Sequence, residues 1–152
     1  MKRKILVPHD GYEMSDKALK YAIEIAKAMH MGIIILRVMP HVIDHSSIIF
    51  LHEKEQNRIK RNMAKINKQV KWQIYNKLAK QLTMCSSEGV RASRMVLIGD
   101  PVEKILSVAR TEDPYLIIIG SRKLKGFGKL KLLGSVARKL SEEAKCPVMI
   151  VH

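Results

Sequence analysis

Five short apolar runs, separated by segments with helical periodicity, constrain the fold of this chain more than any other feature. The runs are KILVP (4–8), IIILRV (33–38), RASRMVLIG (91–99), YLIIIG (115–120) and CPVMIV (146–151). Nearly continuous apolar runs that are rich in Ile and Val are typical of strands buried on both faces of a parallel sheet. Strands that alternate with helices predict an α/β protein with three layers, in which helices cover both faces of the sheet.

The segments between these runs carry helix signals of different strength. Ser15 is expected to cap the first helix. Apolar residues spaced three and four apart predict one long amphipathic helix over 59–82, with lysines on its other faces. Asp100 followed by Pro101 is a strong helix start, and this helix is expected to end near Thr111. A last helix is predicted over 135–144.

Length and composition bound the class of protein. A chain of 152 residues suits a single domain, 1–152. The two cysteines, Cys85 and Cys146, do not form a CxxC pair and are expected to be reduced thiols of an intracellular protein. The apolar runs are far shorter than the ~20 residues of a membrane span. We therefore expect a soluble, cytoplasmic protein without a membrane partner.

The net charge of +14 is concentrated in two segments, 51–85 with +7 and 121–152 with +6. A basic patch raises the local concentration of acidic partners, among them nucleic acid. The alternative is a solvated helix face that keeps the protein soluble. Trp72 lies among the lysines of the long helix, where it is expected to pack partly against the sheet. The competing interpretation is that Trp72 stacks on a base of single-stranded nucleic acid.

Ligands of open α/β sheets bind beyond the carboxyl ends of the strands, at the point where the strand order reverses. The residues that follow each strand are therefore the candidates for a binding site. They are Pro8, His9 and Asp10 after the first strand, Val38 at the end of the second, and Gly120 and Ser121 after the fourth.

The segment GSRKLKGFGKLKLLGS (120–135) combines four glycines with five basic residues and no acid, directly before a helix. Glycines let the backbone approach a phosphate, and helix N-termini favour anions. The segment therefore indicates either a phosphate site or a glycine-rich connector with solvated lysines. His41 and His45 are too weak a pattern to predict a metal site, so no metal-binding residue is expected. No catalytic residue is predicted either, because no general base has a clear partner.

Three motifs together resemble the universal stress protein family. They are ILVPHDG with S.KAL.YAIEIAK, GDPVEKIL.VA, and LIIIGSR with LLGSVARKL and CPVMIV, in that order along nearly the whole chain. The resemblance implies a Rossmann-like parallel sheet of five strands in the order 3-2-1-4-5, and homodimers. The apolar C-terminal strand, at an expected sheet edge, is consistent with such pairing.

Family members that hold ATP carry the pattern Gly-x2-Gly-x9-Gly-Ser/Thr. Gly120 and Gly134-Ser135 match its outer parts, whereas Lys123 takes the inner glycine position and the segment is one residue longer. Gly126 or Gly128 would then serve as the inner glycine.

The resemblance implies the roles of the site residues. Asp10 and Val38 would flank adenine, and Pro8 and His9 would shape the pocket. The ribose and phosphates would meet the remaining residues: Gly120, Ser121, Arg122, Gly134, Ser135 and Val136.

The function that the resemblance implies is a regulatory, non-enzymatic stress-response dimer. It would bind ATP or AMP, with a divalent metal on the phosphates if the ligand is ATP, and slow ATP hydrolysis stays compatible with this role. The alternative is a family member that binds no nucleotide and uses its basic surface for an acidic partner or nucleic acid.

Overall fold

The structure is a computed structural model that describes residues 3–40, 51–121 and 134–152. Strands and helices alternate along the chain. The strands are β1 (Lys4–Pro8), β2 (Gly32–Met39), β3 (Ala92–Ile98), β4 (Leu116–Gly120) and β5 (Val148–Val151). The helices are α1 (Glu13–Ala28), α2 (Glu53–Lys77), α3 (Ala79–Ser87), α4 (Pro101–Glu112) and α5 (Ser135–Glu143).

The five strands form one parallel sheet in the order β3-β2-β1-β4-β5, which confirms the predicted fold class and strand order. The strand β1 lies in the middle, with Ile5 opposite Ile33 of β2 on one side and opposite Leu116 of β4 on the other. The order reverses between β1 and β4. On one side of β1 the chain adds β2 and then β3, and on the other side it adds β4 and then β5.

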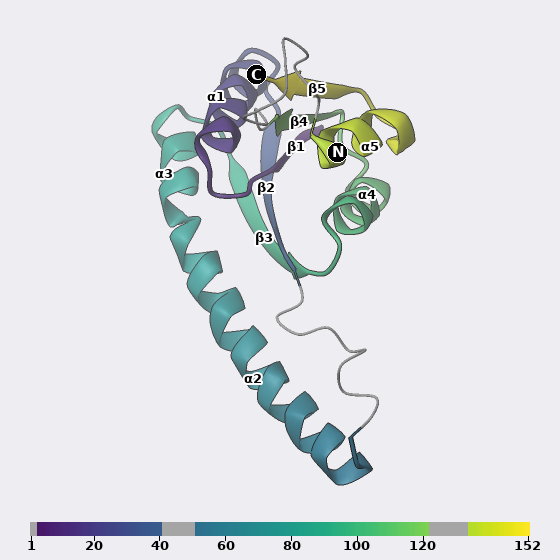
Figure 1. Cartoon of the computed structure of the whole chain (residues 1–152). Helices are drawn as coiled ribbons and strands as arrows, with labels where there is room; N and C mark the ends of the chain where they lie inside the picture. The colour runs from purple at the N-terminus through teal and green to yellow at the C-terminus, as the bar shows by residue number, and fades with distance from the viewer. Residues whose placement is uncertain (1–2, 41–50, 122–133) are drawn as a thin grey trace.

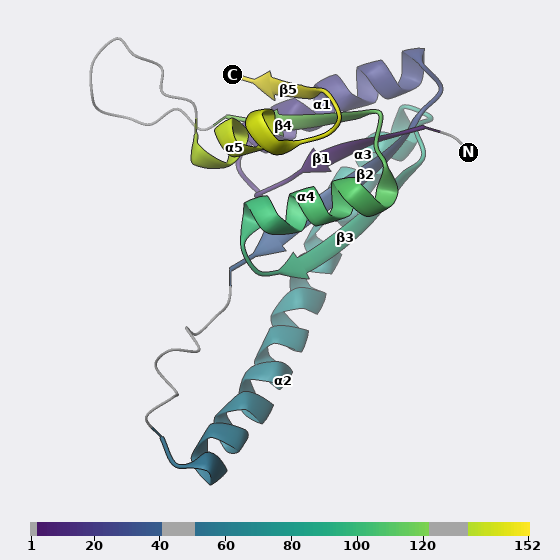
Figure 2. The ribbon, with the colours of Figure 1, turned by 90° about the vertical axis from the view of Figure 1, so that its right-hand side faces the viewer.

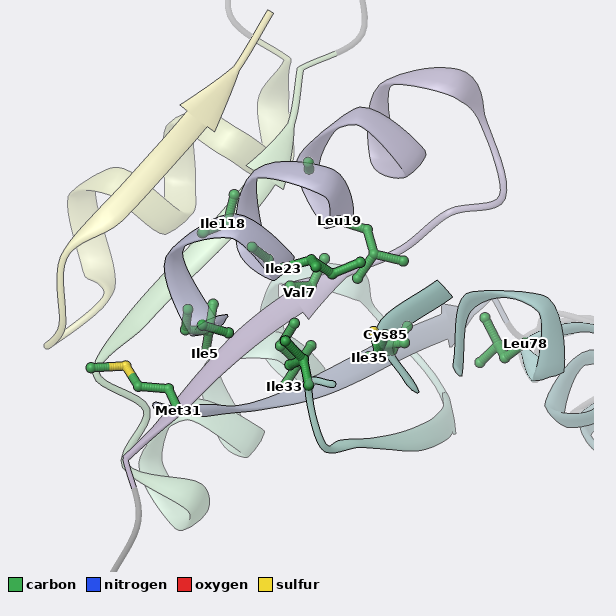
Figure 3. Packing of buried hydrophobic residues seen from close by; sticks show 14 of the residues in the cluster. Ile5, Val7, Leu19, Ile23, Met31, Ile33, Ile35, Leu78, Cys85 and Ile118 are labelled. Atoms are coloured by element: carbon green, nitrogen blue, oxygen red, sulfur yellow. The ribbon is translucent and has the colours of Figure 1, made fainter. Parts of the chain in front are cut away.

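Helices cover both faces of the sheet (Figure 1). Successive residues of a strand enter different cores. In β1, Ile5 and Val7 pack toward α1 and α3, whereas Leu6 packs toward α4 and α5. Figure 3 shows the first of these cores, in which Leu19 of α1 meets strand residues. Because the central strands are buried on both sides, their apolar runs are continuous rather than alternating.

Helix boundaries depart from the predictions in two places. The first helix is not capped by Ser15: Tyr12 is the N-cap without a side-chain cap bond, and the Ser15 hydroxyl donates to the Tyr12 carbonyl at 2.7 Å. The predicted long helix begins earlier, at Glu53, and is interrupted at Leu78, so that α2 and α3 are separate. Leu78 is only 4% exposed and belongs to the core between the sheet and α1. The interruption therefore buries an apolar side chain where the helix meets the body of the protein, that is, the sheet and the helices packed on it.

The local signals at α4 are confirmed. The Glu103 backbone N–H donates to Asp100 Oδ1 at 2.9 Å, and Pro101 occupies the first turn. An Asp at the N-cap followed by Pro satisfies free N–H groups within a few residues, so it needs no tertiary contact to act. Elsewhere, Cys85 is a buried free thiol and Cys146 a partly buried one. Within the described ranges, no helix has the length and apolar character that a membrane span requires.

Candidate functional site

The carboxyl ends of β1 and β4 meet at one edge of the sheet, because the two strands are parallel neighbours. Figure 2 shows the end of β1, the end of β4 and the beginning of α5 at this edge. The turn from β1 into α1 and the start of α5 are therefore the described parts of the predicted crevice. In folds of this kind the reversal point leaves room for a ligand between the two halves of the sheet.

His9 is 3% exposed at the end of β1, and both of its ring nitrogens have partners within the chain. Its Nε2 lies 2.9 Å from Asp16 Oδ1, and the Gly11 N–H donates to its Nδ1 at 3.3 Å. The neutral ring with hydrogen on Nε2 satisfies both contacts. Burial lowers the pKa of His9 below its ordinary value, and the hydrogen bond to Asp16 opposes that shift only in part.

Asp16 connects this turn to a distant helix. Its Oδ1 also accepts a hydrogen bond from Nε2 of Gln81 at 3.2 Å, and Gln81 belongs to α3. One carboxylate thus joins the end of β1, the first turn of α1 and α3. The sequence pattern gave no sign of this link, because Gln81 lies 65 residues from Asp16.

Asp10 and the glycine after it shape the exposed part of the turn. The Asp10 Oδ1 accepts the Tyr12 N–H at 3.1 Å, and Gly11 has a φ of +84°. Any residue with a Cβ would be strained at this φ, and its Cβ would lie 3.5 Å from Nη1 of Arg37. Arg37 Nη1 itself donates to the His9 carbonyl at 3.3 Å.

Arg37 is a candidate site residue that sequence reasoning missed. It lies on β2 and brings a positive charge beside the turn that holds Asp10. The available signal was its place as the one cation of the apolar run IIILRV, near a strand end.

Gly120 ends β4 against the backbone of α1. A Cβ at this position would lie 2.3 Å from the Met14 carbonyl oxygen and 2.9 Å from the Ser15 nitrogen. The glycine therefore lets strand and helix approach closely, whatever ligand the crevice takes. The next residue, Ser121, is 3% exposed, and its N–H donates to the Val151 carbonyl at 2.8 Å.

The start of α5 supplies backbone donors at the same edge. Gly134 is the N-cap and makes no side-chain cap bond, and the first turn, which includes Ser135 and Val136, has no acidic residue. Among the described residues, no atom lies within 4 Å of a Cβ built on Gly134. Free N–H groups and the helix dipole make such a start favourable for an anion.

The remaining predicted residues divide into two groups. Pro8 is the buried last residue of β1, and Val38 of β2 is partly buried against the core formed with α4 and α5. The residues of the glycine-rich segment between the strand and helix lie outside the described residues. They are Arg122, Lys123, Gly126 and Gly128.

A groove of about 620 Å³ lies at the opposite edge, where the strands begin, and is lined in part by Lys4, Lys27, Glu88 and Arg91. Lys27 pairs with Glu88 at 2.9 Å, and Lys4 pairs with Glu112 at 2.8 Å. Two of the cations are thus already neutralised. Over the described parts of the chain, no group of three His, Cys, Asp or Glu side chains is placed to hold a metal ion.

The parallel order with its reversal, the polar turn after β1 and the start of α5 at the same edge define a doubly wound α/β fold, in which ligands bind at the switch point between the two halves of the sheet. The chain belongs to the universal stress protein family, whose family model matches residues 1–152.

Relatives of known name and structure agree with this assignment. The universal stress protein YxiE of Bacillus subtilis is 32% identical over 156 residues and covers 100% of both chains. The universal stress protein of Archaeoglobus fulgidus, solved in complex with dAMP, is 18% identical with a TM-score of 0.63, and the match covers 100% of this chain and 98% of that one. A universal stress protein solved in complex with cAMP is 21% identical with a TM-score of 0.70, covering 99% and 97%. At these identities the two structures establish the fold.

Proposed function

We propose that this protein binds an adenine nucleotide, ATP or AMP, in the crevice between the β1 turn and the start of α5. The observation that carries the proposal is the first turn of α5, which lies at the edge where β1 and β4 end. Within the described residues, Gly134 makes no cap bond and no atom lies within 4 Å of its Cβ position. The phosphates would bind the N–H groups at Ser135 and Val136. Adenine would lie near Asp10 and Val38, as in the arrangement that the family resemblance implies.

Other residues of the crevice have supporting roles in this proposal. Arg37 adds a cation near the adenine end, and Ser121 continues the chain from β4 toward the phosphates. Arg122, together with Gly126 or Gly128, would approach the phosphates, and a divalent metal would arrive on the phosphates of ATP. Relatives solved with dAMP and cAMP support an adenine nucleotide as the ligand class.

The proposed role is regulatory, in a cytoplasmic stress response, rather than catalytic. His9 is the described side chain at this edge best suited to act as a base, but both of its nitrogens are engaged within the chain. It therefore offers no free nitrogen that would accept a proton from an attacking water. Binding would instead change the state of the crevice and so signal to a partner.

Nucleotide binding is tested by denaturing the purified protein, analysing the supernatant for released nucleotide, and titrating ATP and AMP by calorimetry. Replacing Gly134 by Arg should abolish binding, because a long side chain would fill the space beside the helix start. Ser141→Arg is the matched control, since it adds the same charge to an exposed position near the end of α5. No released nucleotide and no heat up to millimolar ligand would eliminate the proposal.

We also propose that two copies form a homodimer along β5. The N–H groups of Ile117 and Ser121 donate to the carbonyls of Pro147 and Val151, so Ile150 between them points its backbone groups away from β4. Ile150→Pro removes one outward N–H and keeps the bonds to β4. Sedimentation should show a dimer for the natural chain and a monomer for the variant, and an unchanged dimer would place the interface elsewhere.

A further inference from the structure

The helix α2 extends away from the body of the protein. Figures 1 and 2, which view the chain from two directions, both show α2 as an arm whose far end is remote from the sheet. Of its 25 residues only Met63 is buried. Val70 and Ile74, near its C-terminal end, are partly buried against the core. Packing thus accounts for the last part of α2 but leaves most of its length exposed.

Two opposite rows of side chains run along α2. The apolar row consists of Ile59, Met63, Ile66, Val70 and Ile74. The second row is exposed and consists of Lys54, Arg58, Arg61, Lys65, Lys68 and Trp72. Arg61, Lys68 and Trp72 each precede a residue of the apolar row by two positions, and two residues turn about 200° around a helix. The second row therefore lies on the side opposite the apolar row.

The charge of this row is not balanced within the described chain. The helix has eight basic and two acidic residues, and both acids, Glu53 and Glu55, lie in its first turn. The ion pairs that the described residues form involve Lys4, His9, Lys27 and Lys104, which all lie outside α2. Within the described residues the cations of this row, from Lys54 to Lys68, form no ion pair, and they span about 21 Å, since a helix rises about 1.5 Å per residue.

Trp72 lies at the end of the basic row nearest the body. It is 67% exposed, so the prediction that it packs partly against the sheet is wrong. Tyr75 follows three residues later with 40% exposure, and the Arg94 guanidinium stacks 3.8 Å from its ring centre. A large exposed aromatic next to cations indicates a binding surface more strongly than scattered lysines do.

The position of Trp72 also distinguishes between classes of polyanion. A helix that lies on a membrane carries its tryptophan on the apolar face, with the lysines opposite. In α2 the tryptophan shares the face of the lysines. That arrangement suits a ligand which presents negative charges and flat apolar rings together, as unpaired nucleotides do.

We propose that the basic face of α2, from Lys54 to Trp72, binds single-stranded nucleic acid. The phosphates contact Arg58, Arg61, Lys65 and Lys68, and an unpaired base stacks on the indole of Trp72. The sequence left solvation and nucleic-acid binding as alternatives for these residues, and the exposure of Trp72 on the basic face favours binding. This proposal is independent of the adenine site, which lies at the crevice between β1 and β4.

Because Trp72 is the only tryptophan of the chain, intrinsic fluorescence reports on this residue alone. We expect a 20-nucleotide oligothymidylate to quench the emission saturably at low salt. Four phosphate contacts predict a slope of about −3 in a plot of log affinity against log salt concentration. A duplex of the same length should bind without comparable quenching, since its bases are not free to stack.

Variants separate stacking from charge, with binding measured by the anisotropy of a labelled oligonucleotide. Trp72→Ala should weaken binding about five- to 150-fold, and Trp72→Phe should restore most of it. The triple change of Arg61, Lys65 and Lys68 to Gln should make the salt slope shallower by about 2. The matched control changes Lys20, Lys139 and Lys145 to Gln, which removes the same charge from exposed positions of the body and should leave the slope unchanged.

Several results would overturn the proposal. They are the absence of quenching at low salt, equal binding by the Trp72→Ala variant, and equal effects of the two triple changes. Tighter binding of polyglutamate than of the oligonucleotide would indicate that α2 binds an acidic protein instead of nucleic acid. A blue shift of Trp72 emission with vesicles of phosphatidylcholine and phosphatidylserine, but no change with the oligonucleotide, would indicate that α2 binds a membrane surface instead.

Discussion

Replacing Gly120 by Ala should destabilise the fold by a clash that can be located atom by atom. The new Cβ would lie 2.3 Å from the Met14 carbonyl oxygen and 2.9 Å from the Ser15 nitrogen. Ordinary van der Waals separations are about 3.5 Å, so the end of β4 or the start of α1 would have to move by about 1 Å. Both obstacles are backbone atoms, which no change of side-chain rotamer relieves.

The size of the effect follows from measured costs of overpacking. These costs are typically about 1–3 kcal/mol, and a backbone clash beside a central strand belongs in the upper part of that range. We expect Gly120→Ala to lower the free energy of unfolding by about 2–3 kcal/mol. For a chain of this length that corresponds to a melting temperature about 5–10 °C lower.

Urea denaturation followed by circular dichroism provides the measurement, and Gly134→Ala provides the control. Gly134 has an ordinary φ of −58°, and no atom of the described residues lies within 4 Å of its Cβ position, so its substitution should change stability by less than about 0.5 kcal/mol. If Gly120→Ala unfolds within about 0.5 kcal/mol of the natural chain, the close approach of β4 and α1 does not constrain this position.

Two further predictions concern titratable groups. Burial lowers the pKa of His9, so below pH 6.5 the unfolded chain binds more protons than the folded chain. The stability that His9 gives at neutral pH is therefore lost as the pH falls from 6.5 through the pKa of the folded state. An NMR titration of the His9 ring should show a midpoint below 6.5, whereas a midpoint above 6.5 would mean that the contact with Asp16 outweighs burial. Burial also raises the pKa of Cys85 to about 11, so a thiol reagent at pH 8 should modify Cys146 in the native protein and Cys85 only after unfolding. Equal rates for both thiols in the native state would contradict the burial of Cys85.

Features that depend on nearby residues were predictable from the sequence. The central strands appear as apolar runs because both of their faces are buried, and α4 begins at Asp100 because its cap is local. The break at Leu78 was not predictable, since neither Gly nor Pro marks it and it depends on how the helix meets the body.

The candidate site divides in the same way. The rule for strand ends located the turn at His9 and Asp10, and the parallel pairing of β1 and β4 brings the two strand ends to one edge. The partners of the His9 ring and the reason for glycine at Gly120 depend on contacts between distant segments. The exposure of Trp72 depends on where α2 leaves the body, which periodicity alone does not encode.

The central place of β1 in the sheet has a consequence for synthesis on the ribosome. This strand emerges first and finds β2 soon afterwards, but its other neighbour, β4, emerges only after three further helices and β3 have been made. Until then a nascent chain exposes one bare, apolar edge of its innermost strand, the type of surface on which unfinished proteins aggregate. Chaperone protection during translation should therefore matter most before β4 has emerged.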